Sequence, residues 1–356
     1  MIPINRPFLP PLEEYQEYLQ AIWERNWLTN DGPLVQELES RLRDYLGVKD
    51  VLYVSSGTMA LQIAIKATKL SGEVITTPFS YVATTSTLAW EGCKPVFVDI
   101  NPETLNIDPE KIEEAITDQT TGILATHVFG NPCDVSKISE IARKYDLRVI
   151  YDAAHAFGSK LNEDSVFVAG DLSVTSCHAT KLFHTVEGGL IISKHADLMQ
   201  KIRFLRNFGH DGPGKFNGLG INGKNSEVHA AVGLCNLAFV NNILEKRKTD
   251  YELYVDLLSD QELKFVTSAP GSNYSYMPIL FKSQSQCLTV MSALESKSIF
   301  PRRYFWPSLT ELDYVESGDM ELCTDISQRI LCLPHYFDLK SEDIGLVCST
   351  IKKAMS

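Results

Sequence analysis

The segment CHATKLFHTVEGG, residues 177–189, places a single lysine, Lys181, among small polar residues and shortly before two glycines. A lysine on a solvated surface needs no such setting, because a flexible ammonium group in water is indifferent to its neighbours. A lysine that acts as a nucleophile does need one, since its amine must lose a proton near neutral pH and meet its target at a fixed place. The segment alone leaves both interpretations open, and the rest of the chain decides between them.

A second candidate group follows an apolar run. In VIYDAAHAFG, Asp152 ends the run and His155 comes three residues later. Ligands of open parallel sheets bind at the carboxyl ends of strands, so an acid there can face a ligand site; the alternative is a helix N-cap or a surface acid. Pyridoxal phosphate needs a Schiff-base lysine and an acid that holds its pyridinium nitrogen. Together, Asp152 and Lys181 predict a site for this cofactor.

Two further segments fit the same cofactor. VSSGTMALQIAI is a β-rich run followed by a helix, and SSGT lies at the junction, where free N–H groups and the helix dipole favour a phosphate. Ser-Gly-Thr is also an ordinary N-cap, so this segment alone is weak support. PFSYVATT adds Phe79 and Tyr81 after another predicted strand, where an aromatic ring can stack on the cofactor.

The composition is that of a soluble globular enzyme, with 356 residues, 44% hydrophobic and 22% charged. A net charge of -12 disfavours a general role on nucleic acid or anionic membranes. No stretch approaches the roughly 20 apolar residues of a membrane span, and the first residues lack the features of a signal peptide, so we expect a cytoplasmic protein. The eight cysteines form no C-x-x-C pair and are interpreted as reduced core thiols without a metal.

Two amphipathic helices are predicted at residues 12–28 and 34–47, and β-rich runs then alternate with helical stretches, PEKIEEAI at 109–116 among them. Such alternation favours a mostly parallel sheet with crossover helices. The glycine-rich segment 212–225 is predicted to be loop, and a long helical region to follow at about 226–258. Beyond it the pattern is that of a smaller α+β portion. We place the domain change near residue 245, which gives domains 1–245 and 246–356.

The order of SSGTMAL, TPFSYVAT, VFVDI, NIDP, YDAAHAFG, CHATK, LRNFG and GINGKNSEVHAAVGL resembles the sugar-nucleotide aminotransferase family of fold-type I pyridoxal phosphate enzymes. The resemblance covers nearly the whole chain. It implies an α/β fold with a large, mostly parallel seven-stranded sheet domain that binds pyridoxal phosphate and a small α+β C-terminal domain. IWERNWLTNDGPLVQELE and HATKLFHTVEGG are most similar to the branch that makes dTDP-4-amino-4,6-dideoxy-D-glucose, or viosamine.

Carried over residue by residue, the resemblance implies that Lys181 forms the Schiff base with the cofactor. Asp152 would pair with the pyridinium nitrogen, and Tyr81 would stack on the ring. The residues implied to hold the cofactor phosphate are Gly57, Thr58 and Ser176. Lys181 and Asp152 are therefore the expected catalytic residues.

Two other residues are implied to reach the cofactor. Asn222, in GINGK, would contact the phosphate of a neighbouring subunit, which implies a homodimer with shared active sites. His155 lies where most family members carry glutamine, near the phenolic oxygen of the cofactor. The departure keeps a side chain that forms hydrogen bonds but leaves its protonation state open.

The candidate substrate-binding residues are His184, Glu187, Arg206, Arg302, Arg303 and Tyr304. Structural alternatives stay open for them: His184, like His178, can satisfy a structural hydrogen bond, and Glu187 can face solvent before the Gly-Gly turn. Arg206 can bind a donor carboxylate or a diphosphate, or form a structural ion pair. The segment FPRRYFWP, which contains the last three, can hold a nucleotide diphosphate or serve packing between domains.

The resemblance implies a transamination in two halves. L-glutamate gives its amino group to the cofactor and leaves as 2-oxoglutarate, and a 4-keto-6-deoxy sugar nucleotide then receives the amino group. Lys181 would serve as base and acid in both halves. A 3-keto sugar nucleotide aminotransferase shares these motifs and stays an alternative, and a non-catalytic protein of this fold is a remote one. The family context implies that the product enters an O-antigen or a similar lipopolysaccharide glycan.

Overall fold

The computed structural model describes residues 1–266, 270–316 and 318–356. Its main sheet has seven strands in the order β1-β9-β8-β5-β4-β2-β3. The strands are β1 (Val51–Val54), β2 (Glu73–Thr76), β3 (Lys94–Phe97), β4 (Thr120–Thr126), β5 (Arg148–Asp152), β8 (Leu172–Ser176) and β9 (Gly189–Ile192). Only β9 runs antiparallel to its neighbours within this sheet. The predicted large, mostly parallel seven-stranded sheet is confirmed.

Local signals place the helices around this sheet. The helices that precede the bend described below are α1 (Leu12–Arg25), α2 (Pro33–Leu46), α3 (Gly57–Thr68), α4 (Val82–Trp90), α5 (Val135–Lys144) and α6 (Ala196–Arg206). Pro33 begins α2, and Gly47 ends it in the left-handed conformation at φ 63°. The helices predicted at 12–28 and 34–47 are therefore confirmed. Residues 109–116 form two 3-10 turns instead of a helix, since so short a segment gains little from helical hydrogen bonds.

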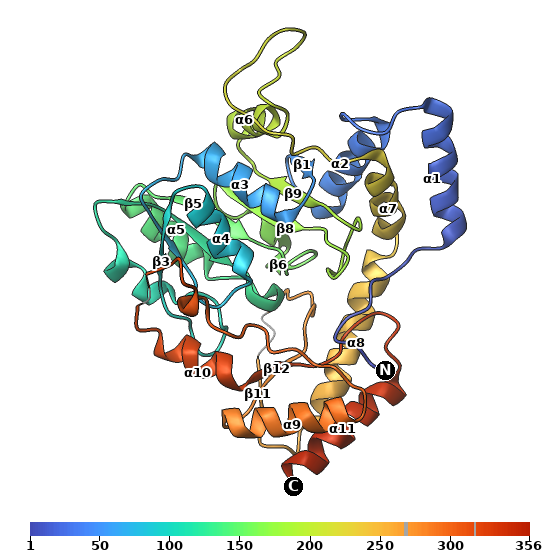
Figure 1. The fold of residues 1–356 in the computed structure, drawn as a ribbon, viewed down its shortest axis with the longest axis vertical. Coiled ribbons are helices and arrows are strands. Elements are labelled where there is room, and N and C mark those ends of the chain that lie inside the picture. The colour runs from blue at the N-terminus through green and yellow to red at the C-terminus, as the bar shows by residue number, and fades with distance from the viewer. Residues whose placement is uncertain (267–269, 317) are drawn as a thin grey trace.

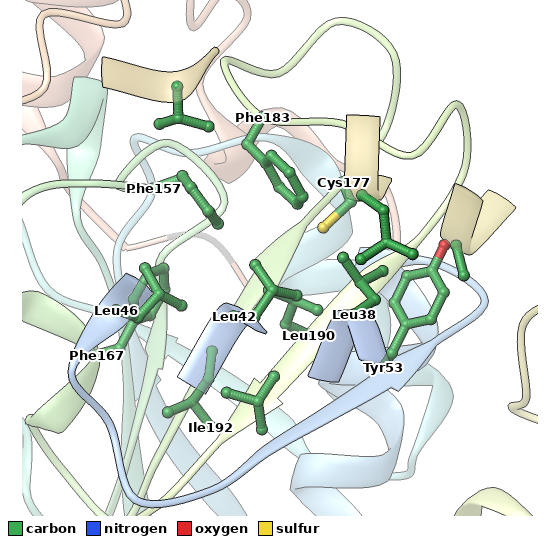
Figure 2. Packing of buried hydrophobic residues seen from close by; sticks show 14 of the residues in the cluster. Leu38, Leu42, Leu46, Tyr53, Phe157, Phe167, Cys177, Phe183, Leu190 and Ile192 are labelled. Carbon is green, nitrogen blue, oxygen red and sulfur yellow. The ribbon is translucent and has the colours of Figure 1, made fainter. Parts of the chain in front are cut away.

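One face of α2 packs on the main sheet (Figure 2). This face carries three leucines one turn apart, Leu38, Leu42 and Leu46. The same cluster contains Cys177 and the stacked rings of Phe157 and Phe183, whose centroids lie 4.4 Å apart. Because Cys177 and Phe183 are buried on either side of Lys181 in the sequence, the core fixes the loop that carries the lysine.

The predicted helical region 226–258 is two helices, α7 (Glu227–Leu237) and α8 (Val240–Leu258). They meet at a bend of 59°. In Figure 1, α8 runs from the helices around the main sheet down to the second sheet. The domain boundary predicted near residue 245 lies within α8, which continues across it. Among the described residues no single helix is long and apolar enough to cross a membrane; α7 and α8 meet those requirements only as a bent pair.

The C-terminal portion is a three-stranded antiparallel sheet with its own core. Its elements are β10 (Lys264–Phe265), β11 (Pro278–Leu280), α9 (Gln284–Ser296), α10 (Glu321–Arg329), β12 (Ile330–Cys332) and α11 (Ser341–Met355). Ile2 forms a β-bridge with Ile299, so the N-terminus lies against this portion, as Figure 1 shows. A two-stranded ribbon, β6 (Lys160–Leu161) and β7 (Asp164–Ser165), completes the strands described. All eight cysteines are free and buried.

Candidate active site

Residues at one edge of the main sheet line a cavity of about 560 Å³. β1, β2, β5 and β8 all run in the same direction, so their carboxyl ends meet at this edge. Gly57 follows β1, Tyr81 follows β2, and Asp152 and Ser176 end β5 and β8. Lys181 comes from the loop between β8 and β9. The cavity thus occupies the place where open parallel sheets bind ligands.

Lys181 is held by a loop that closes on itself. The amide of Cys177 donates to the carbonyl of Gly188 at 2.8 Å, and the amide of Lys181 donates to the carbonyl of His178 at 2.9 Å. Burial lowers the pKa of the Lys181 amine to about 8, although Asp152 acts in the opposite direction. A fraction of this amine is therefore neutral near physiological pH, as a nucleophile or base requires.

Asp152 is held rigidly at the wall of the cavity and is 5% exposed. Its Oδ2 accepts from the Thr84 hydroxyl at 2.8 Å, and its Oδ1 accepts from the amide of Ala154 at 3.1 Å. Burial raises the pKa of the carboxyl group, whereas these two hydrogen bonds and Lys181 act to lower it. The arrangement is a fixed, desolvated acid whose charge a cationic ring nitrogen would balance.

The junction between β1 and α3 forms a cradle suited to an anion. The three residues predicted to hold the phosphate all line the cavity: Gly57, Thr58 and Ser176. A Cβ at Gly57 would lie only 2.8 Å from the Cβ of Ser176, so the close approach of the first residue of α3 to the end of β8 requires glycine. Ser56 accepts from the amide of Met59, while the other N–H groups of the first turn lack intrahelical partners. Such a helix start binds phosphate.

Aromatic side chains complete the region around these groups. Tyr81 lines the cavity and is 60% exposed, so its ring is accessible for stacking on a ligand. The ring of His155 is buried and lies 5.5 Å from that of Phe305, with 8° between the two planes. Burial lowers the pKa of His155 well below its usual value, so the imidazole is neutral. Amine, acid, anion cradle and aromatic ring therefore surround one cavity, and together they fit pyridoxal phosphate.

Two of the predicted substrate residues, Glu187 and Tyr304, line the cavity. His178, for which the sequence also left a structural role open, lines it too, with its Nε2 3.6 Å from Oε1 of Glu187. These three side chains are therefore placed where a substrate can reach them.

Arg206 does not line this cavity. It is 6% exposed, and its guanidinium lies 2.9 Å from a carboxylate oxygen of Glu39 and 3.1 Å from one of Asp31. It also donates to the carbonyl of Tyr53 at 3.0 Å. These contacts correspond to the structural ion pair and not to an anion site.

Three other predicted substrate residues also lie outside the cavity lining, namely His184, Arg302 and Arg303. The Nε2 of His184 lies 2.7 Å from the carbonyl oxygen of Phe8, so its contact is structural. Arg303 donates to the carbonyl of Gln328 and stacks over Trp306 at 4.1 Å. Arg302 is exposed, and its backbone pairs with Cys332.

Asn222 is exposed and does not line the cavity of its own chain. Its backbone forms a bridge with Asn207, and the next residue, Gly223, accepts from the amide of Ser55 at 2.9 Å. The loop is thus attached beside the anion cradle. Contact with a neighbouring subunit stays a prediction.

Six cavity residues from the C-terminal half were not predicted from the sequence, namely Arg247, Ser275, Tyr276, Phe305, Leu333 and His335. A signal was present for one of them. Arg247 stands in the buried stripe of α8, between Ile243 and Tyr251, where helical spacing favours an apolar residue. The side chains that flank it, Lys246 and Lys248, make the segment look like an ordinary solvated face.

Comparison with known proteins agrees with this geometry. The chain is 44% identical over 364 residues to the dTDP-4-amino-4,6-dideoxy-D-glucose transaminase of Shigella dysenteriae, with 98% of each chain covered. It is 39% identical to the enzyme of the same name from Escherichia coli, with 96% of this chain and 95% of the relative covered. The crystal structure of DesI with its TDP-sugar product superposes with a TM-score of 0.95 at 31% identity, covering 99% of this chain and 93% of that one.

The sequence profile of one family spans residues 12–352, nearly the whole chain. The profile covers both the main sheet and the C-terminal portion, and it contains the described cavity-lining residues except Ile4 and Asn5. On this match, and on the relatives above, the chain belongs to the DegT/DnrJ/EryC1/StrS aminotransferase family, whose enzymes depend on pyridoxal phosphate.

Proposed function

We propose that this enzyme transfers an amino group from L-glutamate to dTDP-4-keto-6-deoxy-D-glucose and so forms dTDP-4-amino-4,6-dideoxy-D-glucose and 2-oxoglutarate. Two relatives that carry the name of this transaminase match over almost their full length, at 44% and 39% identity. The observation that carries the proposal is structural. Lys181, with its pKa lowered to about 8, and the fixed acid Asp152 line one cavity.

Different residues of the cavity would hold different parts of the cofactor. The first turn of α3 and Ser176 would hold the cofactor phosphate, Asp152 would hold the pyridinium nitrogen, and Lys181 would bond to the aldehyde carbon. Tyr81 would cover one face of the ring. When bound, the cofactor supplies an electron sink for the pair left behind when the donor Cα–H bond breaks.

Lys181 then moves the protons. With the cofactor bound, its neutral Nζ would take the proton from the donor Cα as a base. In the second half the same Nζ delivers a proton to C4 of the sugar. Because a proton is first accepted and later donated, an amine with a pKa near the working pH serves better than an ordinary lysine.

The enzyme is further proposed to act as a homodimer in the cytoplasm, with its product used for an O-antigen or a similar surface glycan. The loop between α6 and α7 projects from the body of the chain (Figure 1). It exposes a row of apolar side chains, Phe208, Phe216, Leu219 and Ile221. A second subunit would cover them and bring Asn222 to its own cofactor phosphate, which supports the shared site.

The deciding experiment is one incubation of purified protein with pyridoxal phosphate, L-glutamate and dTDP-4-keto-6-deoxy-D-glucose, with the amino position of the product determined by NMR. An equatorial amine at C4 that disappears in Lys181→Ala supports the proposal. A glutamate half-reaction without an amino sugar would keep the transaminase and redirect the search to 3-keto isomers or another nucleotide. Absence of a cofactor absorbance band between 330 and 400 nm would favour a non-catalytic protein.

A further inference from the structure

The wall of the cavity formed by the C-terminal half contains a buried arginine. Arg247, in α8, lines the cavity and is 5% exposed. It belongs to the buried stripe of the helix with Val240, Ile243, Tyr251, Tyr254 and Leu258. Removing a guanidinium from water is energetically unfavourable unless a charged or hydrogen-bonded partner compensates for the lost hydration, so a partner is expected at this position.

The described residues provide no carboxylate partner for Arg247. Its Nη1 donates to the backbone carbonyls of His335 and Ser275, the latter at 3.4 Å, and its Nε has no partner in the described part of the chain. Asp250, one turn further along α8, is bound by Lys246, whose Nζ lies 2.6 Å from Oδ1. The carbonyls orient the guanidinium, but they leave its charge unbalanced.

A second unsatisfied donor lies next to this arginine. Ser275 also lines the cavity, and its buried Oγ has no hydrogen-bond partner among the residues described. Burial lowers the pKa of Arg247 to about 10, while Tyr276 and Asp250 act in the opposite direction, so the group keeps its charge at neutral pH. A guanidinium without a carboxylate partner and a hydroxyl group without a hydrogen-bond partner among the described residues therefore lie side by side at the wall of the cavity.

We propose that Arg247, assisted by Ser275, binds a carboxylate group of the amino donor L-glutamate; this rests on the transaminase function proposed above. A guanidinium matches the geometry of a carboxylate and binds it by charge-assisted hydrogen bonds. Among the described residues that line the cavity, the lysines and arginines are Lys181 and Arg247, and Lys181 serves the cofactor. One remaining cation suits one carboxylate better than a diphosphate, which carries more negative charge. The keto sugar itself has no carboxylate.

The test measures binding of glutarate, a dicarboxylate without an amino group, to the holoenzyme by titration calorimetry. Arg247→Gln should lower the affinity for glutarate at least about 30-fold, because the carboxylate loses its buried cationic partner. Arg247→Lys should recover part of the affinity, since it restores charge without the fork. Ser275→Ala should lower the affinity for glutarate several-fold. The affinity for dTDP should not change in any of these variants. The uncharged glutaramide should bind weakly to all of them.

The kinetic counterpart separates the two halves of the reaction. Arg247→Gln should raise the glutamate concentration needed for half-maximal rate, while the amine form of the holoenzyme should react with the keto sugar as the wild type does. Arg329→Gln is the matched control, because Arg329 also donates to a backbone carbonyl, that of Phe281, but pairs with Asp325 away from the cavity. It should bind glutarate normally.

The proposal is overturned if folded Arg247→Gln binds glutarate like the wild type, or loses dTDP affinity instead. If this variant does not fold, Arg247→Lys and Ser275→Ala decide in the same way, and normal glutarate binding by both is equally negative. Failure of the wild type to aminate the sugar, with glutarate binding intact and dependent on Arg247, would reject the proposed sugar substrate and keep the donor site.

Discussion

The two walls of the cavity differ in how their polar groups are satisfied. On the wall of the main sheet, Asp152 accepts two hydrogen bonds and Ser56 caps α3, although Nδ1 of His155 has no partner in the described part of the chain. On the wall of the C-terminal half, Nε of Arg247, Oγ of Ser275 and Nδ1 of His335 have no partners within the described ranges. Buried polar groups are nearly always paired, so the neighbouring unpaired atoms of Arg247 and Ser275 at the cavity indicate a ligand. Asp152 and the start of α3 are thus held in place before a substrate arrives, whereas a substrate would supply the missing partners of Arg247 and Ser275.

Two buried arginines show the same contrast. Arg206 is 6% exposed and is paired with Glu39 and Asp31, while Arg247 is 5% exposed and, among the residues described, has backbone carbonyls as its partners. Similar burial thus accompanies opposite states of charge compensation. The first arginine is expected to stabilise the fold, and the second to bind an anion.

The largest loss of activity on the sheet wall is expected for Lys181→Ala, because this change removes the nucleophile, base and acid together. We expect turnover to fall about 10⁴-fold or more. The measurement is amino sugar formed per enzyme in the coupled reaction, beside a thermal unfolding scan, which should show no loss of stability since a desolvated amine is removed. Turnover within tenfold of the wild type would contradict the assignment of the lysine.

Asp152→Asn tests the charge of the same wall at nearly constant shape. Asparagine can still accept from Thr84, but it cannot balance a pyridinium nitrogen. The expected loss is about 10²- to 10³-fold in the rate of the glutamate half-reaction, the size of a lost electrostatic contact in an active site. Stopped-flow absorbance of the bound cofactor measures it, and an unchanged rate would show that the acid does not contact the ring.

Arg206→Gln tests whether Arg206 has a structural role, in contrast to the ligand-binding role proposed for Arg247. It leaves Glu39 buried without its cation, and we expect the free energy of unfolding to fall by about 3 kcal/mol. Turnover per folded molecule and affinity for glutarate should stay as in the wild type. Urea unfolding, with activity normalised to the folded fraction, checks both expectations. A loss of substrate affinity without a loss of stability would instead show that Arg206 binds substrate.

The pH dependence of cofactor uptake follows from Lys181. Burial lowers its pKa to about 8, so the folded state holds the proton below that pH and releases it above. Only the neutral amine attacks an aldehyde, so the rate of uptake of pyridoxal phosphate by the apoenzyme should rise about tenfold per pH unit up to pH 8 and then level off. A rise that continues to pH 10 would show an ordinary exposed lysine.

The smallest effect is expected for His155→Gln. The imidazole is neutral because burial lowers its pKa well below the usual value, so glutamine replaces one neutral side chain that forms hydrogen bonds with another. Turnover should change by no more than about threefold, an energy below that of a typical hydrogen bond. The pH profile between 6 and 8 should not change, whereas a lost ionisation in that range would mean that His155 titrates.

The sequence predicted the sheet wall well, and for a physical reason. Asp152 and Ser176 are at strand ends, and Gly57, Tyr81 and Lys181 follow strands, so a parallel sheet brings them to one edge whatever the details of the loops. The helical region predicted at about 226–258 is confirmed, but its division into α7 and α8 was not predicted, because both halves have helical patterns and only packing reveals the 59° bend.

What the sequence determined by itself is the set of chemical groups on the sheet wall and the family, because local patterns of strand, turn and helix specify both. Only the tertiary structure decided which arginine meets the cavity. The carboxylate partners of Arg206 lie more than 160 residues away along the chain, and Arg247 meets Ser275 and His335 only through the fold. Whether a buried charge is compensated depends on which groups lie near it in the folded chain, and the order of residues does not show this.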